Sequence, residues 1–200
     1  MAAPFNKRGN RENLSIVDFH DQLMARHGAS WREPSVGNIV WQPEDEALAL
    51  CTIAPVRASN PWGFKDPRTL LLLDGWLRLF PKMRLVGIFR NPSAVCKSLS
   101  ARGGSLAVDH EAGERLWVHY NRLLLDIMHQ HDAPLLSFDV PQVEFDTRVN
   151  GLCDAFGLSE NQGTFFTSEL RNDVVLNEEI HEPETLALYQ SLRFYYEQQV

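Results

Sequence analysis

The chain has 200 residues, of which 44% are hydrophobic, and this length and composition suit one globular domain with its own core. Its formal net charge is −7. This acidic balance argues against nonspecific binding to nucleic acid, and the sequence has no basic run interleaved with aromatic residues. No apolar run reaches membrane-spanning length and no signal peptide pattern opens the chain, so we expect a cytoplasmic protein with no membrane partner. The three cysteines lack zinc-ligand spacing, and we expect no metal site.

The first predicted element is a helix over residues 13–27, which Gly28 ends. We assign Leu14, Val17 and Met24 to its buried side. His20 and Asp21 are adjacent, and neighbouring side chains on a helix point in different directions. We therefore expect these two residues to belong to a charged surface. Residues 32–60 contain one short candidate helix, at 45–53, and no candidate functional residue.

A change from strand to helix is predicted around Lys65. Residues 62–65 are assigned to a short strand, and Asp66 and Pro67 begin the following helix. Lys65 then lies beside a helix N-terminus, where its ammonium group can reach a phosphate or sulfuryl oxygen. The alternative is that Lys65 and Arg68 form a surface pair around the helix cap.

A second change from strand to helix follows at residues 84–103. The apolar residues 85–89 predict a buried strand, and Asn91 is a favourable N-cap for the next helix. Arg90 falls at the carboxyl end of this strand, so its guanidinium and the helix N-terminus together suit an anion. Ser98 falls on roughly the same helix face as Asn91. The alternative is a simple strand and helix in which Arg90 pairs with a carboxylate.

The remaining pattern completes an α/β fold. We expect helices over residues 109–129, 143–156 and 183–198 and a strand over 133–139. Strands near 62–65, 85–90 and 134–139, joined by helical crossovers, predict a three-layer α/β/α fold with a short, mostly parallel sheet. Lys65 and Arg90 both follow strands, and ligands of such sheets bind at the carboxyl ends of strands. We therefore expect one shared anion site.

Several of these segments resemble sulfotransferases that use 3′-phosphoadenosine 5′-phosphosulfate (PAPS). Arg90-Asn91-Pro92, with Ser98 eight positions after the arginine, resembles the family's segment for the 3′-phosphate of the donor. The run from Lys65 to Arg68 resembles the family's catalytic lysine segment, and residues 6–12 resemble a stretch near the active site of bacterial members. The resemblance covers about residues 6–195 and implies the P-loop NTPase-like fold of this family.

The resemblance also implies roles for individual residues. The 3′-phosphate of PAPS, or of the product adenosine 3′,5′-bisphosphate (PAP), would be held by Arg90, Asn91 and Ser98. Lys65 would stabilise charge on the transferring sulfuryl group. Glu12 would be the base for the acceptor hydroxyl, although a solvated charge before a helix is the alternative. Arg171 would add a contact to the donor.

One departure concerns the catalytic base. In the cytosolic branch of the family a histidine two residues after the lysine is the base, and this position is Pro67 here. Proline has no group that accepts a proton. The Lys-x-Pro pattern with a glutamate base, as in the glycan-type and bacterial branches, is the closer match.

The other departure is that the family's first strand and its 5′-phosphosulfate-binding loop have no counterpart in the sequence. We therefore expect residues 1–200 to form a single sulfotransferase-like domain, N-terminally truncated relative to the family. Its sheet would have an open edge for a second copy or another chain.

Two functions stay open. The first is sulfuryl transfer from PAPS to a hydroxyl or amine of a small-molecule or glycan acceptor, without a metal. The second is a non-catalytic nucleotide-binding or interaction module, so the sequence does not decide whether the protein is an enzyme. A kinase-like enzyme is disfavoured because no Walker-type loop is present.

Overall fold

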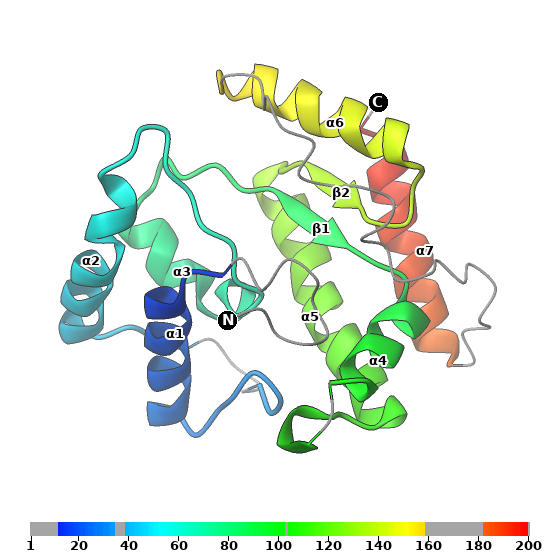
Figure 1. Ribbon diagram of the computed structural model, residues 1–200, viewed down its shortest axis with the longest axis horizontal. Helices are drawn as coiled ribbons and strands as arrows, with labels where there is room; N and C mark the ends of the chain where they lie inside the picture. Colours follow the sequence, from blue (N-terminus) through cyan, green and yellow to red (C-terminus); the bar gives the residue numbers. More distant parts are fainter. Residues whose placement is uncertain (1–11, 35–38, 103, 159–181, 200) are drawn as a thin grey trace. The chain divides into compact units, whose positions relative to one another are not determined.

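The computed structural model describes residues 12–34, 39–102, 104–158 and 182–199 (Figure 1). The elements in chain order are α1 (Leu14–Arg26), α2 (Pro43–Arg57), α3 (Thr69–Leu79), β1 (Gly87–Phe89), α4 (Pro92–Ser100), a 3₁₀ turn (Gly104–Leu106), α5 (His110–His131), β2 (Leu135–Ser137), α6 (Gln142–Ala155) and α7 (Pro183–Glu197). The chain divides into two compact units, Met1–Arg84 and Leu85–Val200, which are described separately. The class is α/β, with helices and a short parallel sheet.

The first unit is built from α1, α2 and α3 around an aromatic core. The rings of Phe19, Trp41 and Trp76 meet edge to face, with centroids 5.2 to 5.9 Å apart. Aliphatic side chains complete this core: Ile16, Leu23, Met24, Ile39, Ile53 and Leu72. Gly75 has no side chain to separate α3 from the Trp41 ring, because a Cβ atom there would lie 2.0 Å from that ring.

Local sequence signals set the ends of the helices in this unit. The side chain of Asn13 accepts the N–H groups of Ser15 and Ile16 and so caps α1. Gly28, with φ of +67°, follows the end of α1. At α2, Pro43 is the first helical residue and the Asp45 carboxylate accepts the N–H of Gln42.

The second unit contains a two-stranded parallel sheet. Gly87 of β1 lies opposite Leu135 of β2, and the crossover between the strands contains α4 and α5. Helix α5 packs against β1, and α6 and α7 pack against β2 (Figure 1). A Cβ atom at Gly87 would lie 2.7 Å from the Met128 sulfur, so glycine permits this close packing of α5. The N–H of Leu135 donates to the side chain of Gln199 (2.8 Å), which covers the far edge of β2.

Most predicted elements of the second unit are confirmed. Asn91 caps α4 by accepting the N–H of Ala94 (3.2 Å), and Asp109 caps α5 by accepting the N–H of Ala112 (2.8 Å). Strands β1 and β2 lie within the predicted segments, and α6 and α7 lie within one residue of their predicted bounds. The sheet that the described residues form has two strands.

In the first unit, the expected strand at residues 62–65 and the expected burial of Leu14 are wrong. Residues 62–65 form no strand in the described chain. Their apolar alternation instead directs two rings into the aromatic core, Trp62 against Phe80 and Phe64 against Trp76. Leu14 is 73% exposed, because the buried stripe of α1 repeats from Ile16 and does not include position 14. In the part of the chain that the structure describes, no helix combines the length and apolarity needed to cross a membrane.

The contact between Gly75 and Trp41 predicts a large effect of one methyl group. We expect Gly75→Ala to lower the free energy of unfolding by about 3 kcal/mol, because the buried indole ring blocks the added Cβ atom. Urea unfolding followed by tryptophan fluorescence measures this change. Gly63→Ala is the control, because a Cβ atom at Gly63 meets no atom within 4 Å, and we expect a change within about 0.5 kcal/mol. Equal stabilities of the two variants would contradict this packing.

Candidate functional site

The two predicted catalytic residues lie in contact in the first unit. The Lys65 Nζ atom lies 2.5 Å from Glu12 Oε1, although 53 positions separate the residues in the chain. The Lys65 side chain is 64% exposed, whereas that of Glu12 is 17% exposed. Glu12 directly precedes Asn13, the N-cap of α1, so its negative charge lies near the positive end of this helix. The structure thus places an accessible ammonium group beside a mostly buried carboxylate.

The charge of Glu12 follows from opposing effects. Burial raises the pKa of its carboxyl group, but the hydrogen bond and the positive charge of Lys65 outweigh burial, and the net pKa is lowered. Glu12 is therefore ionised at neutral pH. Its Oε1 atom accepts from Lys65, while its buried Oε2 atom receives no hydrogen bond from another described residue. One oxygen of this carboxylate is left to accept a proton or a hydrogen bond.

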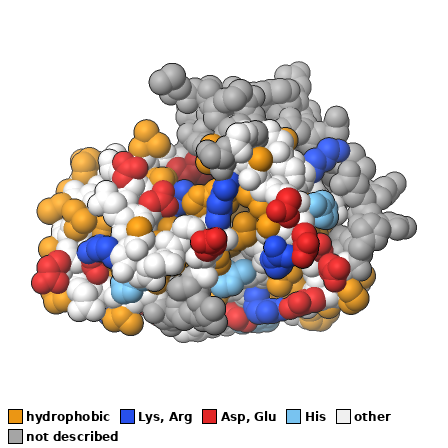
Figure 2. All heavy atoms as spheres, turned by 90° about the horizontal axis from the view of Figure 1, so that it is seen from below, with side chains coloured by type: hydrophobic (Ala, Val, Ile, Leu, Met, Phe, Trp, Pro, Cys, Tyr) orange, Lys and Arg blue, Asp and Glu red, His pale blue; other side chains and the backbone are white. Residues whose placement is uncertain are grey.

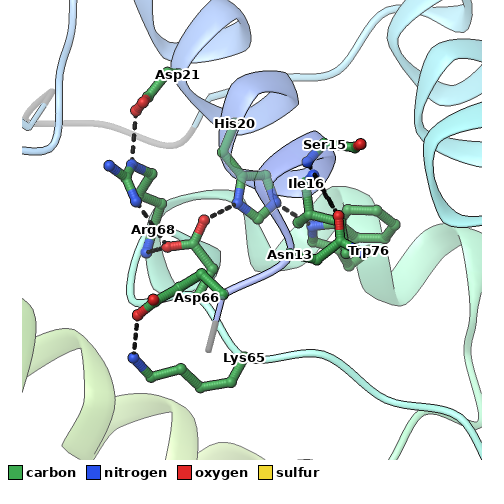
Figure 3. A network of polar contacts seen from close by, with 10 residues as sticks. Asn13, Ser15, Ile16, His20, Asp21, Lys65, Asp66, Arg68 and Trp76 are labelled. Atoms are coloured by element: carbon green, nitrogen blue, oxygen red, sulfur yellow. Dashed lines mark hydrogen bonds and ion pairs between the residues drawn. The ribbon is translucent and has the colours of Figure 1, made fainter. Parts of the chain in front are cut away.

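Buried hydrogen bonds hold Asp66, the residue that follows Lys65, in place (Figure 3). The Asp66 Oδ2 atom lies 2.8 Å from His20 Nδ1, and the indole N–H of Trp76 donates to His20 Nε2 over 2.9 Å. Because Nε2 accepts from the indole, the proton of the neutral imidazole is on Nδ1, which donates to Asp66. The His20 side chain is completely buried and both of its ring nitrogens are used. His20 therefore positions Asp66 and has no nitrogen left for a substrate.

Arg68 satisfies the second oxygen of the same aspartate. Asp66 Oδ1 accepts from the Arg68 backbone N–H and from Arg68 Nη1, both over 3.1 Å. Arg68 Nε in turn donates to Asp21 of α1 over 2.6 Å (Figure 3). Burial raises the pKa of Asp66, but the hydrogen bond from His20 and the contacts with Arg68 outweigh burial, so the net pKa is lowered and this carboxyl is ionised. Residues 65–68 are thus attached to α1 at two points.

This network corrects two sequence-based expectations. His20 does not belong to a charged surface, because it lies in the core, whereas Asp21 is 46% exposed and pairs with Arg68 at the surface. The alternative of a Lys65–Arg68 surface pair is also wrong, since each cation binds a different carboxylate. The helical spacing of Ile16, His20 and Leu23 placed the histidine on the apolar stripe. That spacing was the available signal that His20 is buried.

The predicted phosphate segment lies in the second unit, at the junction of β1 and α4. The guanidinium of Arg90 lies over the ring of Phe138, with its carbon 5.0 Å from the ring centroid. The backbone carbonyl of Arg90 accepts the indole N–H of Trp117 (2.9 Å). Asn91 is buried and its side chain caps α4, whereas Ser98 is exposed. The strand, the cap and the helix are therefore as predicted.

The half-buried carboxylate of Asp139 lies at the start of α4. Asp139 Oδ2 accepts the backbone N–H of Asn91 over 2.6 Å and the hydroxyl of Tyr189 over 3.2 Å. Burial and the neighbouring charge of Asp139 raise the pKa of Tyr189 to about 12, so the phenol keeps its proton and donates. Asp139 was not identified from the sequence as part of this segment. An anion that binds at this helix end must approach beside the Asp139 carboxylate.

The predicted site residues are therefore distributed over both units. Lys65 and Glu12 meet in the first unit, while Arg90, Asn91 and Ser98 belong to the second. Arg171 lies outside the described residues. The shared anion site of Lys65 and Arg90 stays a prediction. No group of three or more potential metal ligands occurs among the residues that the structure describes.

Comparisons with known proteins gave no match among protein-family models, curated proteins or solved structures.

The chain from Trp76 to Asp66 predicts different effects of two substitutions at His20. The amide nitrogen of asparagine can replace Nδ1 and donate to Asp66, whereas the amide oxygen of glutamine can replace Nε2 and accept from Trp76. We expect His20→Gln to lower the free energy of unfolding by about 3 kcal/mol, because the buried carboxylate loses a donor, and His20→Asn by about 1 kcal/mol. Urea unfolding compares the two variants. A larger loss for His20→Asn would contradict the assigned hydrogen bonds.

Proposed function

We propose that the protein is a PAPS-dependent sulfotransferase in which Lys65 and Glu12 carry out the transfer step. The observation that carries this proposal is the contact of Lys65 Nζ with Glu12 Oε1. An ammonium group and an ionised carboxylate in contact suit a reaction that moves a sulfuryl group and a proton. We also propose that the chain adopts the three-layer α/β/α, P-loop NTPase-like fold of the sulfotransferase family.

The proposed transfer follows from the charges of this pair. The hydroxyl or amine of the acceptor attacks sulfur while the bond from sulfur to the phosphate oxygen of PAPS breaks, and PAP leaves with the bonding electrons. The proton of the acceptor passes to Glu12, which is ionised at neutral pH but remains a weak base as long as Lys65 lowers its pKa. Lys65 stabilises the charge that develops on the sulfuryl and leaving-group oxygens. Its exposed side chain can exchange the carboxylate for a sulfuryl oxygen.

The second unit supplies the proposed contacts to the 3′-phosphate. Arg90 carries a permanent positive charge, and the exposed hydroxyl of Ser98 can donate a hydrogen bond. The N–H of Asn91 already donates to Asp139 and the side chain of Asn91 caps α4, so we assign Asn91 to the helix cap beside the phosphate. Arg90 is therefore the main source of affinity. Two further points stay predictions: the contact of Arg171 with the donor, and the binding of a second copy or another chain to the edge of β1.

A non-catalytic nucleotide-binding module is the second candidate. The observation that favours it is the carboxylate of Asp139 at the helix terminus, which reduces the positive potential available to a phosphate. Such a module would bind PAP through Arg90 without transferring a sulfuryl group. Binding and transfer must therefore be measured separately.

Calorimetric titration with PAP tests the donor site. We expect binding with a dissociation constant in the micromolar range, weakened at least about tenfold by Arg90→Ala, because one charge-assisted contact is worth about 1.5–3 kcal/mol. Arg115→Ala is the matched control, since Arg115 is an exposed arginine of the same unit that pairs with Glu111. A folded wild-type chain that does not bind PAP would contradict both candidate functions.

The release of PAP from PAPS, with 4-nitrophenol and glucosamine as acceptors, tests the transfer step. We expect Glu12→Gln to reduce kcat by about 100-fold or more while PAP binding is retained, because only the base is removed. Asp18→Asn, at an exposed position of α1, controls for the loss of a carboxylate. PAP binding without PAP release would favour the non-catalytic module.

A further inference from the structure

The contact between Lys65 and Glu12 joins a movable group to a fixed one. The Lys65 side chain is 64% exposed, so its long stem can turn in water, whereas the Glu12 side chain is 17% exposed and directly precedes the cap of α1. Charged side chains that reach the surface in this way are seen in Figure 2. An exposed ion pair contributes about 0–1 kcal/mol. An anion in solution can therefore compete with Glu12 for the ammonium group, while the carboxylate stays in place.

Two charged side chains act on the Glu12 carboxyl group in opposite directions. The hydrogen bond and positive charge of Lys65 lower its pKa, whereas the negative charge of Asp66 raises it. Asp66 is held in place, because His20 and Arg68 bind its two oxygens (Figure 3). Burial is the largest effect on the pKa of Glu12 and raises it by more than the backbone hydrogen bond of Glu12 lowers it. Once Lys65 leaves, burial and Asp66 therefore raise the pKa of Glu12 above its ordinary value.

We propose that Lys65 is a displaceable counter-ion of Glu12, and that an oxyanion bound by Lys65 makes this carboxylate a stronger base. In the free protein Lys65 keeps Glu12 ionised and weakly basic. When the ammonium group binds the oxyanion, Glu12 is left near Asp66 without its cation. The inference rests on the proposed function, in which the oxyanion is the sulfuryl group of PAPS, and it adds that the donor activates the base.

This control gives the transfer reaction a definite order. PAPS binds first and takes the ammonium group of Lys65, which raises the proton affinity of Glu12 before the acceptor reacts. The acceptor oxygen or nitrogen then bonds to sulfur, the bond from sulfur to the phosphate oxygen breaks with its electron pair going to PAP, and the acceptor proton passes to Glu12. After both products leave, Lys65 returns to Glu12 and lowers its proton affinity, so the proton passes to water. Each cycle thus restores the ion pair.

Removal of the lysine charge tests this control without any ligand. Carbon-detected NMR follows the Glu12 carboxyl group through a pH titration of the wild type and of Lys65→Met. In the variant the proton affinity of Glu12 should rise about tenfold or more, because an opposite charge in contact is lost, and its pKa should lie above the ordinary value of about 4.3. Lys82→Met, which removes an exposed lysine of the same unit, is the control and should leave the titration unchanged. The same Glu12 titration in Lys65→Met and the wild type would overturn the proposal.

PAPS without an acceptor tests the anion. Calorimetry first establishes the PAPS concentration that saturates the wild type. At saturation the Glu12 titration of the wild type should move to higher pH, toward that of ligand-free Lys65→Met, whereas PAP, which lacks the sulfuryl group, should move it less. PAPS that binds without moving the Glu12 titration would overturn the inference and leave the proposed donor site intact. A folded wild type that binds neither PAPS nor PAP would overturn the proposed function and the inference together.

Discussion

The hydrogen bond between His20 and Asp66 is the contact on which the candidate catalytic pair depends. It attaches the segment before α3 to the middle of α1, and Arg68 adds a second attachment through Asp21. Glu12 lies just before the start of the same helix. Because Lys65 is the neighbour of Asp66, fixing Asp66 on α1 also brings Lys65 to Glu12. The core of the first unit thus determines a contact at its surface.

This arrangement requires that both oxygens of the buried Asp66 carboxylate accept hydrogen bonds. Burying the charge of Asp66 is costly unless donors surround it, and it accepts from His20, from the Arg68 backbone and from the Arg68 side chain. Removing one partner from such a buried pair costs about 3–5 kcal/mol, whereas an exposed pair contributes about 0–1 kcal/mol. The Lys65–Glu12 contact is half exposed and adds little stability by itself. The position of the contact is set by the buried hydrogen bonds of Asp66. Because the contact itself is weak, Lys65 can leave Glu12 and bind another anion.

The sequence predicted the features that depend on local signals. Asn91 and Asp109 cap helices because their side chains reach N–H groups three residues later, and Gly28 ends α1 in a left-handed conformation. The partner of His20 lies 46 positions away, so no local pattern could identify the pair. Residues 62–65 were assigned to a strand because apolar alternation is shared by strands and by extended segments that pack rings into a core. The family resemblance assigned Lys65 and Glu12 to one active site, but neither it nor the spacing predicted that the two side chains form an ion pair.

A titration of the Glu12 carboxyl group by carbon-detected NMR tests this account most directly, in the wild type, His20→Asn and His20→Gln. The hydrogen bond and charge of Lys65 hold the pKa of Glu12 below its usual value in the wild type, and His20→Asn, which keeps a donor to Asp66, should preserve this. In folded His20→Gln the segment keeps only its attachment through Arg68 and Asp21, Lys65 is held less firmly beside Glu12, and the pKa of Glu12 should rise toward the usual glutamate value of about 4.3. The same lowered pKa in all three proteins would show that Lys65 reaches Glu12 without the buried network, which would contradict the account.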